Sequence, residues 1–172
     1  MSRGEPPAKP GDQARVSLRV AVPQEAAFRL FTEEIDKWWR RGLKYRVAGG
    51  NRGIMHLEPW VGGRLFESFD AGAEAKIFQT GTVTAWDPPS RLRFEWRAVP
   101  FTADEKTEVE VTFQAATNGT LVTVTHRGWS TIRPDHPARH GLDVAAFTRM
   151  MGLWWGDLLR GLLEHSCRAD DE

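Results

Sequence analysis

The feature that most constrains the fold is a long apolar stripe close to the C-terminus. Between residues 141 and 167, apolar side chains recur at helical spacing: Leu142, Phe147, Met150, Met151, Trp154, Trp155, Leu158, Leu159, Leu162 and Leu163. A stripe of this width predicts a long amphipathic helix with one buried face. Gly152, Gly156 and Gly161 lie within it, and each costs up to about 1 kcal/mol of helix stability relative to alanine. The rest of the chain therefore has to supply an apolar surface for this helix.

Most of the chain before this helix is predicted to be β-strand. Residues 14–22 alternate apolar and polar side chains, and further strand-like runs cover residues 53–59, 64–70, 75–86, 91–98, 107–116 and 120–127. Asn118-Gly119 separates the last two runs, which favours a hairpin between them. In the fifth run, Leu92, Phe94 and Trp96 share one face and charged residues share the other. Strands of this kind form antiparallel sheets with one dry face.

Two short helices are expected between the first and second strands. Pro23 ends the first strand and suits the first turn of a helix. Apolar residues then recur at helical spacing up to Trp39, and Thr32 followed by acidic residues favours a restart before Gly42. The predicted order is one strand, two short helices, six strands and one long helix, which makes an α+β domain.

Length and composition limit the domain organisation and the class of partner. The 172 residues suit one domain, which we place at residues 14–167 between a disordered, proline-containing N-terminal tail (1–13) and a polar C-terminal tail (168–172). Lys+Arg and Asp+Glu both total 23, so no basic surplus favours nucleic acid as a partner. Cys167 is the single cysteine, and no apolar run is long enough for a signal peptide or membrane span. We expect a soluble cytoplasmic protein, although a cysteine-poor secreted protein has the same composition.

Several motifs resemble one protein family. They are the sequences PWVGGRLFE at residues 59–67, GTVTAWDPPSRLRFEW at 81–96, TEVEVTF at 107–113, GTLVTVTHRG at 119–128 and WWGDLL at 154–159. Together they resemble the START-like superfamily, also called SRPBCC, and within it the single-domain homologues of the heat-shock protein 90 ATPase activator. The resemblance spans about residues 14–163. It implies a helix-grip fold, in which a curved antiparallel sheet of about seven strands wraps around the C-terminal helix.

The resemblance also implies a ligand-binding role. Small members of this family look like ligand-binding proteins, and the superfamily includes polyketide cyclases and aromatase-like enzymes. The chaperone-activating role belongs to larger relatives with an additional N-terminal domain, and we do not transfer it. The chain has eight Trp and one Tyr, so aromatic side chains are the best candidates for a pocket lining. The expected lining comprises Trp38, Trp39, Phe66, Phe69, Phe78, Phe94, Trp96, His126, Met150, Met151, Trp154 and Leu158. The alternative is that these residues simply fill the core.

Candidate chemical groups are few. His126 is expected to face inward with Val122 and Val124, where it could bind a ligand or act as a general base, but a histidine satisfied by a backbone carbonyl is favoured. Glu67 and Glu95 are expected to be solvated, on the faces opposite the core. His136 and His140 have metal-ligand spacing, but the neighbouring prolines favour a solvated loop. No nucleophile, phosphate-binding, dinucleotide or metal motif is present, so we expect no cofactor and no metal.

Three functions stay open at this point. The first is binding of a small hydrophobic or aromatic molecule, lipid-like or polyketide-like, in a cavity between sheet and helix. The second is a cyclase or hydrolase that uses the same pocket, for which the sequence offers no catalytic motif. The third is a protein-interaction module or homodimer, suggested by Trp60, Trp129 and Trp155 if they form an exposed patch.

Overall fold

A computed structural model describes residues 12–48, 53–71, 74–97 and 101–169. Its elements, in chain order, are β1 (Gln13–Val20), α1 (Gln24–Thr32), α2 (Ile35–Trp38), β2 (Ile54–Leu57), β3 (Arg64–Ala71), β4 (Glu74–Asp87), β5 (Arg91–Trp96), β6 (Thr107–Ala116), β7 (Gly119–Arg127), the 3-10 turns η1 (Trp129–Thr131) and η2 (Pro137–Arg139), and α3 (Val144–Ala169). The strands form one antiparallel, seven-stranded sheet in the order β1-β7-β6-β5-β4-β3-β2. The predicted order of elements is confirmed.

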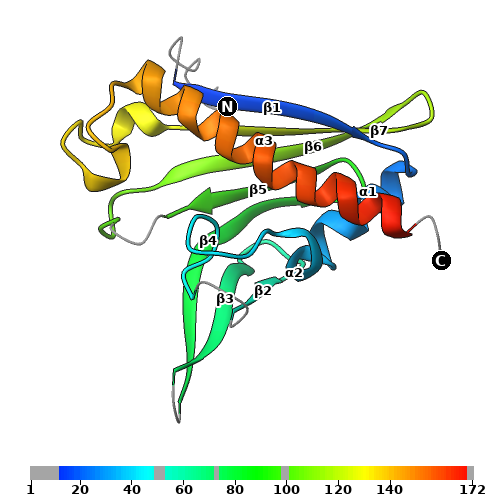
Figure 1. Ribbon diagram of the computed structural model, residues 1–172, viewed down its shortest axis with the longest axis horizontal. Helices are drawn as coiled ribbons and strands as arrows, with labels where there is room; N and C mark the ends of the chain where they lie inside the picture. Colours follow the sequence, from blue (N-terminus) through cyan, green and yellow to red (C-terminus); the bar gives the residue numbers. More distant parts are fainter. Residues whose placement is uncertain (1–11, 49–52, 72–73, 98–100, 170–172) are drawn as a thin grey trace, which may run out of the picture.

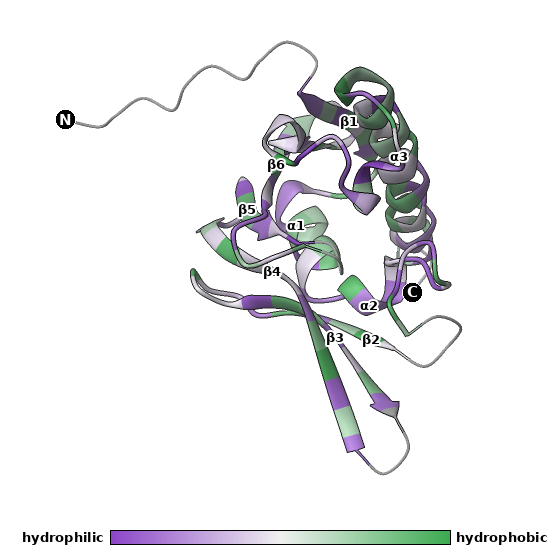
Figure 2. Ribbon diagram, turned by 90° about the vertical axis from the view of Figure 1, so that its left-hand side faces the viewer, coloured by the Kyte–Doolittle hydropathy of each residue, from purple (hydrophilic) through white to green (hydrophobic). Residues whose placement is uncertain are grey.

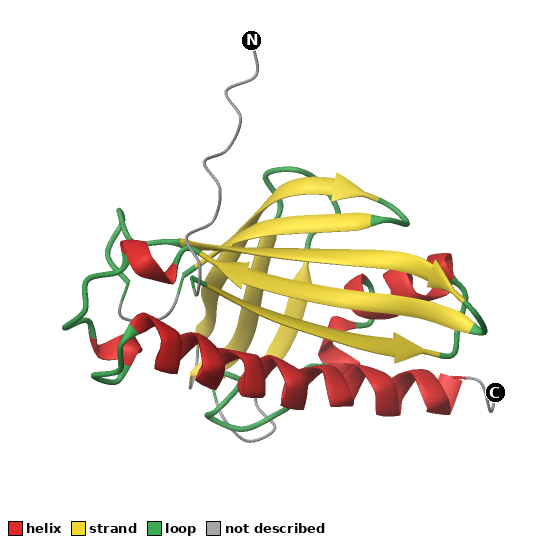
Figure 3. Cartoon of the chain, turned by 90° about the horizontal axis from the view of Figure 1, so that it is seen from above, coloured by secondary structure: helices red, strands yellow, loops and turns green. Residues whose placement is uncertain are grey.

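The sheet curls around α3, which runs along it next to β1 (Figures 1 and 3). The two short helices lie at the end of the sheet where α3 ends, and η1 and η2 lie at the end where α3 begins. Two irregularities in register, at Leu65/Phe66 and Val83/Ala85, interrupt the pairing of β4 with its neighbours, and such bulges increase the bend of a sheet. This arrangement confirms the predicted α+β helix-grip fold.

The inner face of the sheet forms the core together with α3. On β6, Val109, Val111 and Phe113 are buried, and they pair with inward-facing residues of β7. On the outer face, Glu108 lies 3.8 Å from Arg93 and 3.6 Å from Arg127 in a charged ladder. The banded colours of the strands in Figure 2 follow this alternation. The predicted one-sided strands are therefore confirmed. No helix within the described residues is long and apolar enough to cross a membrane.

The β6–β7 hairpin forms as predicted, but its turn lies one residue earlier. Ala116 pairs with Gly119, so Thr117 and Asn118 make the turn, and Asn118 has a φ of 59°. Gly119 is required by a close approach, because a Cβ there would lie 2.1 Å from the carbonyl oxygen of Val20. The glycine thus lets β7 meet the end of β1.

The regular structure extends slightly beyond residues 14–167 at both ends. β1 starts at Gln13, and the buried carboxylate of Asp12 accepts hydrogen bonds of 2.6 Å from both the backbone N–H and the hydroxyl of Ser130. At the other end, α3 continues to Ala169. The rest of the two tails lies outside the described residues.

Candidate ligand-binding site

Four indole rings fill the centre of the space between sheet and helix. They belong to Trp39 after α2, Trp96 on β5, and Trp154 and Trp155 on α3, and every pair has ring centroids between 5.1 and 6.2 Å apart. Such offset and edge-to-face contacts are favourable for aromatic rings. The centre of the expected cavity is therefore packed, and the open space lies on either side of this tryptophan cluster.

A large open space among the described residues lies beside the first half of α3, and we call it the apolar pocket. It has a volume of about 700 Å³, within the usual range for small-molecule sites. Its lining is Leu43, Lys44, Trp96, Trp129, Pro137, Ala138, His140, Phe147, Met150, Met151, Leu153 and Trp154. Methionine side chains adapt their shape to irregular ligands. Four of the predicted lining residues meet here: Trp96, Met150, Met151 and Trp154.

A second pocket, of about 450 Å³, lies on the other side of the tryptophan cluster. Trp39, Phe78, Trp96 and Trp154 line it, together with more polar groups such as Arg46, Glu67 and Arg97. Trp96 and Trp154, with Leu43 and Lys44 of the loop after α2, therefore border both pockets.

Residues 42–48, which we call the strap loop, are held by a buried charge. The side chain of Arg46 is fully buried; it donates to Asp36 Oδ1 at 2.6 Å and to the carbonyl oxygens of Trp39 and Gly53. Burial lowers the pKa of Arg46. For Asp36, burial raises the pKa, but hydrogen bonds from Met55 N–H and Arg46 outweigh it and the pKa is lowered. Both groups therefore stay charged.

Glu67 corrects one prediction, because it is buried rather than solvated. Its side chain points inward from β3 and accepts hydrogen bonds from the backbone N–H groups of Val47 (3.0 Å) and Ala48 (2.7 Å) of the strap loop. Phe66 accordingly faces outward, where its ring stacks on His56 with centroids 4.6 Å apart. Phe66 is thus on the wrong face of the sheet to line either pocket.

The other predicted residues are divided between core and surface. Phe94, His126 and Leu158 are buried in the core, while Trp38 borders a third, polar space. Phe69 is half-buried and, by alternation, shares the inner face of β3 with Glu67. Glu95 is partly exposed and pairs with Lys106 at 2.9 Å, as expected of a solvated glutamate.

His126 is satisfied by side chains on both ring nitrogens. Nδ1 accepts the indole N–H of Trp155 at 3.1 Å, and Nε2 lies 2.7 Å from the hydroxyl oxygen of Thr107. Because Nδ1 is an acceptor, the proton of the neutral ring is on Nε2. Complete burial lowers the pKa of His126 to about 3. The inward face is confirmed, and the ring has no free nitrogen for proton transfer.

Three further predictions about histidine and tryptophan are wrong. His136 is buried: its Nδ1 accepts from Ala138 N–H at 3.0 Å, and its Nε2 lies 3.2 Å from Glu105. Trp129 and Trp155 are also buried, so of the suggested exposed patch only Trp60 is at the surface. In the part of the chain that the structure describes, no three His, Cys, Asp or Glu side chains group as metal ligands.

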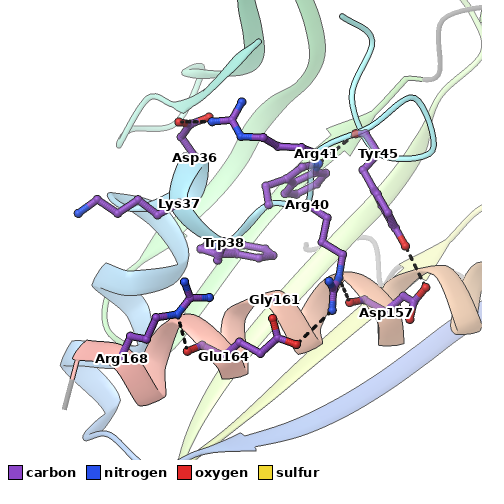
Figure 4. Close-up of a pocket in the computed structure, with 11 residues that line it drawn as sticks. Asp36, Lys37, Trp38, Arg40, Arg41, Tyr45, Asp157, Gly161, Glu164 and Arg168 are labelled. Atoms are coloured by element: carbon purple, nitrogen blue, oxygen red, sulfur yellow. Dashed lines mark hydrogen bonds and ion pairs between the residues drawn. The ribbon is translucent and has the colours of Figure 1, made fainter. Parts of the chain in front are cut away.

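A third space, which we call the charged cleft, lies beside the second half of α3 (Figure 4). It has a volume of about 510 Å³. Asp157 is part of its lining: its carbonyl oxygen accepts from Arg40 Nε at 2.7 Å, and its carboxylate accepts from Tyr45 at 2.9 Å. Arg40 also lies 3.6 Å from Glu164. The polar groups of this cleft therefore serve as partners for one another.

Sequence reasoning missed most of the wall of the apolar pocket opposite the sheet. Phe147 was assigned only to the helix stripe, and Trp129 was expected at the surface. Leu43, Lys44, Pro137 and Ala138 lie in segments with no apolar period, so no signal marks them, and His140 is marked only by its spacing from His136.

Comparison with known proteins identifies the family. Residues 21–154 match the family described as Activator of Hsp90 ATPase homolog 1-like protein. The chain belongs to this family. The match agrees with the resemblance seen in the sequence, and it places the chain in the START-like (SRPBCC) superfamily. A search of curated protein sequences found no match.

Solved structures of similar fold include proteins from several bacteria. Protein NE0264 from Nitrosomonas europaea has 17% identity and a TM-score of 0.62, covering 95% of this chain and 99% of that one. MLL2253 from Mesorhizobium loti has 18% identity and a TM-score of 0.61, covering 91% and 97%. The Aha1 dimer from Colwellia psychrerythraea has 16% identity and a TM-score of 0.58, covering 88% and 93%. At sequence identities of 16–18%, these structures show a shared fold and nothing further about this chain.

Proposed function

We propose that this member of the activator-homologue family binds a small hydrophobic or aromatic molecule, lipid-like or polyketide-like, in the apolar pocket. The observation that carries the proposal is a volume of about 700 Å³ lined mainly by aromatic, aliphatic and thioether side chains, with Lys44 and His140 as the polar ones. A space of this size and lining removes a large apolar area from water when a ligand fills it, which favours binding by about 25 cal/mol for each Å² buried.

The alternative of a cyclase or hydrolase has weaker support. His126 was the one candidate base, and both its nitrogens already have partners, Trp155 and Thr107. Its low pKa leaves it a poor proton acceptor at neutral pH. The lining of the apolar pocket includes one other imidazole, His140, but no carboxylate, hydroxyl or amide side chain that could act with it in acid–base chemistry. We therefore favour binding over catalysis at this site.

The test is titration with N-phenyl-1-naphthylamine, a probe that fluoresces strongly in apolar surroundings. The wild-type protein should bind it saturably and quench or shift its own tryptophan emission. Ala138→Phe adds a ring to the lining of the pocket from a half-buried position in η2, and should weaken binding at least tenfold. Ala145→Phe adds the same bulk at an exposed position of α3 outside the pocket lining and serves as the control. Equal binding by both variants would remove the apolar pocket as the site.

A homodimer is a second proposal. The relative from Colwellia psychrerythraea was solved as a dimer. In this chain, Ile54 and Ile77 are 49% and 56% exposed, and both are in register with Ser68 of β3, so they share the outer face of the sheet edge. Sedimentation velocity should show a dimer that Ile77→Glu dissociates and Leu153→Glu leaves intact. A wild-type protein that is monomeric at every concentration would rule out the homodimer.

The cytoplasmic location stays a prediction.

A further inference from the structure

The apolar pocket and the second pocket share a boundary, formed by the four residues that line both: Leu43, Lys44, Trp96 and Trp154. Two of the side chains at this boundary have hydrogen-bonding groups that are already engaged. The indole N–H of Trp154 donates to the carbonyl oxygen of Lys44 at 2.8 Å. The ammonium group of Lys44 lies 3.4 Å from the carboxylate of Asp157, which lines neither pocket. The indole N–H of Trp96 is the remaining side-chain donor at the boundary.

Within the tryptophan cluster, Trp96 is the one indole whose N–H has no partner. Trp39 donates to the carbonyl oxygen of Tyr45 at 3.1 Å. Trp155 donates to Nδ1 of His126, also at 3.1 Å. With the bond at the boundary, three of the four indoles are therefore satisfied by the chain itself. Nε1 of Trp96 forms no hydrogen bond with any of the described residues.

The N–H of Trp96 also keeps accessible surface. Trp39 and Trp155 are 2% and 0% exposed, whereas Trp96 is half-buried. Among the described residues, the side-chain nitrogens that are both buried and without a partner include Nε1 of Trp129 but not Nε1 of Trp96. Since Nε1 of Trp96 has no partner, it is left off that set because it is not buried. The Trp96 ring points from β5 towards the indoles of α3, so its open surface belongs to the two pockets that it lines.

A ligand that covers this donor removes it from water, and an N–H left unpaired in apolar surroundings is costly. We propose that the ligand of the apolar pocket presents an acceptor oxygen, as in a ketone, quinone or ester carbonyl, to Nε1 of Trp96 at the boundary with the second pocket. This inference rests on the proposed function, because it concerns the ligand of the same pocket. It narrows that ligand from any apolar molecule to one that carries a hydrogen-bond acceptor.

Two probes of nearly equal shape test the proposal. 2-Acetylnaphthalene carries a carbonyl oxygen where 2-isopropenylnaphthalene carries a methylene group. Competition against N-phenyl-1-naphthylamine should show the ketone binding roughly fivefold tighter to the wild-type protein, the value of one neutral hydrogen bond. In Trp96→Phe the two probes should bind equally, whatever the change in their common affinity. Trp154→Phe is the matched control: it removes an indole from the same boundary, but one whose N–H already has a partner, so the preference should persist.

A spectroscopic measurement covers the case in which Trp96→Phe fails to fold. In ¹⁵N-tryptophan-labelled wild-type protein, the Trp96 indole N–H resonance should lie further downfield with the ketone bound than with the alkene bound. Equal affinity of the two probes for the wild-type protein, or a preference that survives in Trp96→Phe, overturns the acceptor inference and leaves the proposed function standing. A preference lost in both variants also overturns it, because the effect would then follow the shape of the boundary. Binding of neither probe, nor of the naphthylamine, overturns both proposals.

Discussion

The two halves of α3 border open spaces whose linings differ in polarity. Along the first half, Phe147, Met151 and Trp154 face the apolar pocket, whose lining is mostly aromatic and aliphatic. Along the second half, Asp157 and Glu164 face the charged cleft, where Arg40 donates to the carbonyl oxygen of Asp157 and lies 3.6 Å from the carboxylate of Glu164. The spaces are of comparable volume, about 700 and 510 Å³.

The comparison shows that volume alone does not identify a ligand site. A ligand in the charged cleft would have to break ion pairs such as Arg40–Glu164, whose groups are partly solvated and already satisfied. A ligand in the apolar pocket displaces water from apolar surface and breaks no ion pair within the lining. The strap loop connects the two, since Tyr45 borders the cleft while Leu43 and Lys44 border the pocket.

The largest expected effect comes from releasing the strap loop. Asp36→Ala leaves the fully buried Arg46 without its counter-ion, which should lower the free energy of unfolding by about 3 kcal/mol. Because the loop also borders the pocket, binding of the naphthylamine probe should weaken in the same variant. Urea denaturation measures the first effect and the titration measures the second. In Glu34→Ala, which breaks the exposed pair with Lys37, both quantities should change little; a similar loss in the two variants would show that Arg46 does not hold the loop.

Two glycines of α3, one in each half, provide a matched test of how closely the rest of the chain packs against the helix backbone. A Cβ at Gly161 would lie 2.4 Å from the carbonyl oxygen of Trp38, whereas a Cβ at Gly156 has nothing within 4 Å. Gly161→Ala should therefore destabilise the protein by about 2 kcal/mol through forced separation of α2 and α3. Gly156→Ala should stabilise it by up to about 1 kcal/mol through helix propensity. Thermal unfolding would compare them, and shifts of the same sign would contradict the close approach.

The wall behind the apolar pocket should make stability depend on pH. Burial lowers the pKa of His126 from 6.5 to about 3, so the unfolded chain takes up a proton that the folded chain excludes. This stability is complete above pH 6.5 and is lost as the pH falls from about 6.5 towards 3; at pH 5 the loss amounts to about 2 kcal/mol. His126→Gln should flatten the change in unfolding free energy between pH 7 and pH 5. An unchanged slope would mean that another group titrates there.

Strand alternation made much of this fold predictable. The inward face of His126 follows from Val124 and Val122, two and four residues earlier, and the stripe of α3 follows from its period. Glu67 could not be assigned in the same way, because its burial depends on two backbone N–H groups from a loop about 20 residues away. A local pattern predicts which residues share a face, but it does not show which polar group finds a distant partner.

The candidate site was less predictable for the same reason. Trp129 follows Gly128 in a 3-10 turn, where no period indicates its direction, and it is buried because α3 brings Phe147 against it. Trp39, Trp96 and Trp154 were expected to surround a ligand, yet with Trp155 they pack against one another. Composition predicted an aromatic centre but not where the aromatic rings leave space.

The smallest expected effect comes from removing one ion pair of the charged cleft. Glu164→Gln removes the carboxylate that lies 3.6 Å from Arg40, in a pair whose side chains are 57% and 32% exposed. Exposed pairs contribute little because water and salt screen them, so the free energy of unfolding should change by less than about 0.5 kcal/mol. Probe binding should be unchanged, since the cleft and the apolar pocket share no lining residue. Calorimetry at low and high salt would measure the first quantity; a large loss at low salt would show that the cleft is a cooperative network rather than a set of separate surface pairs.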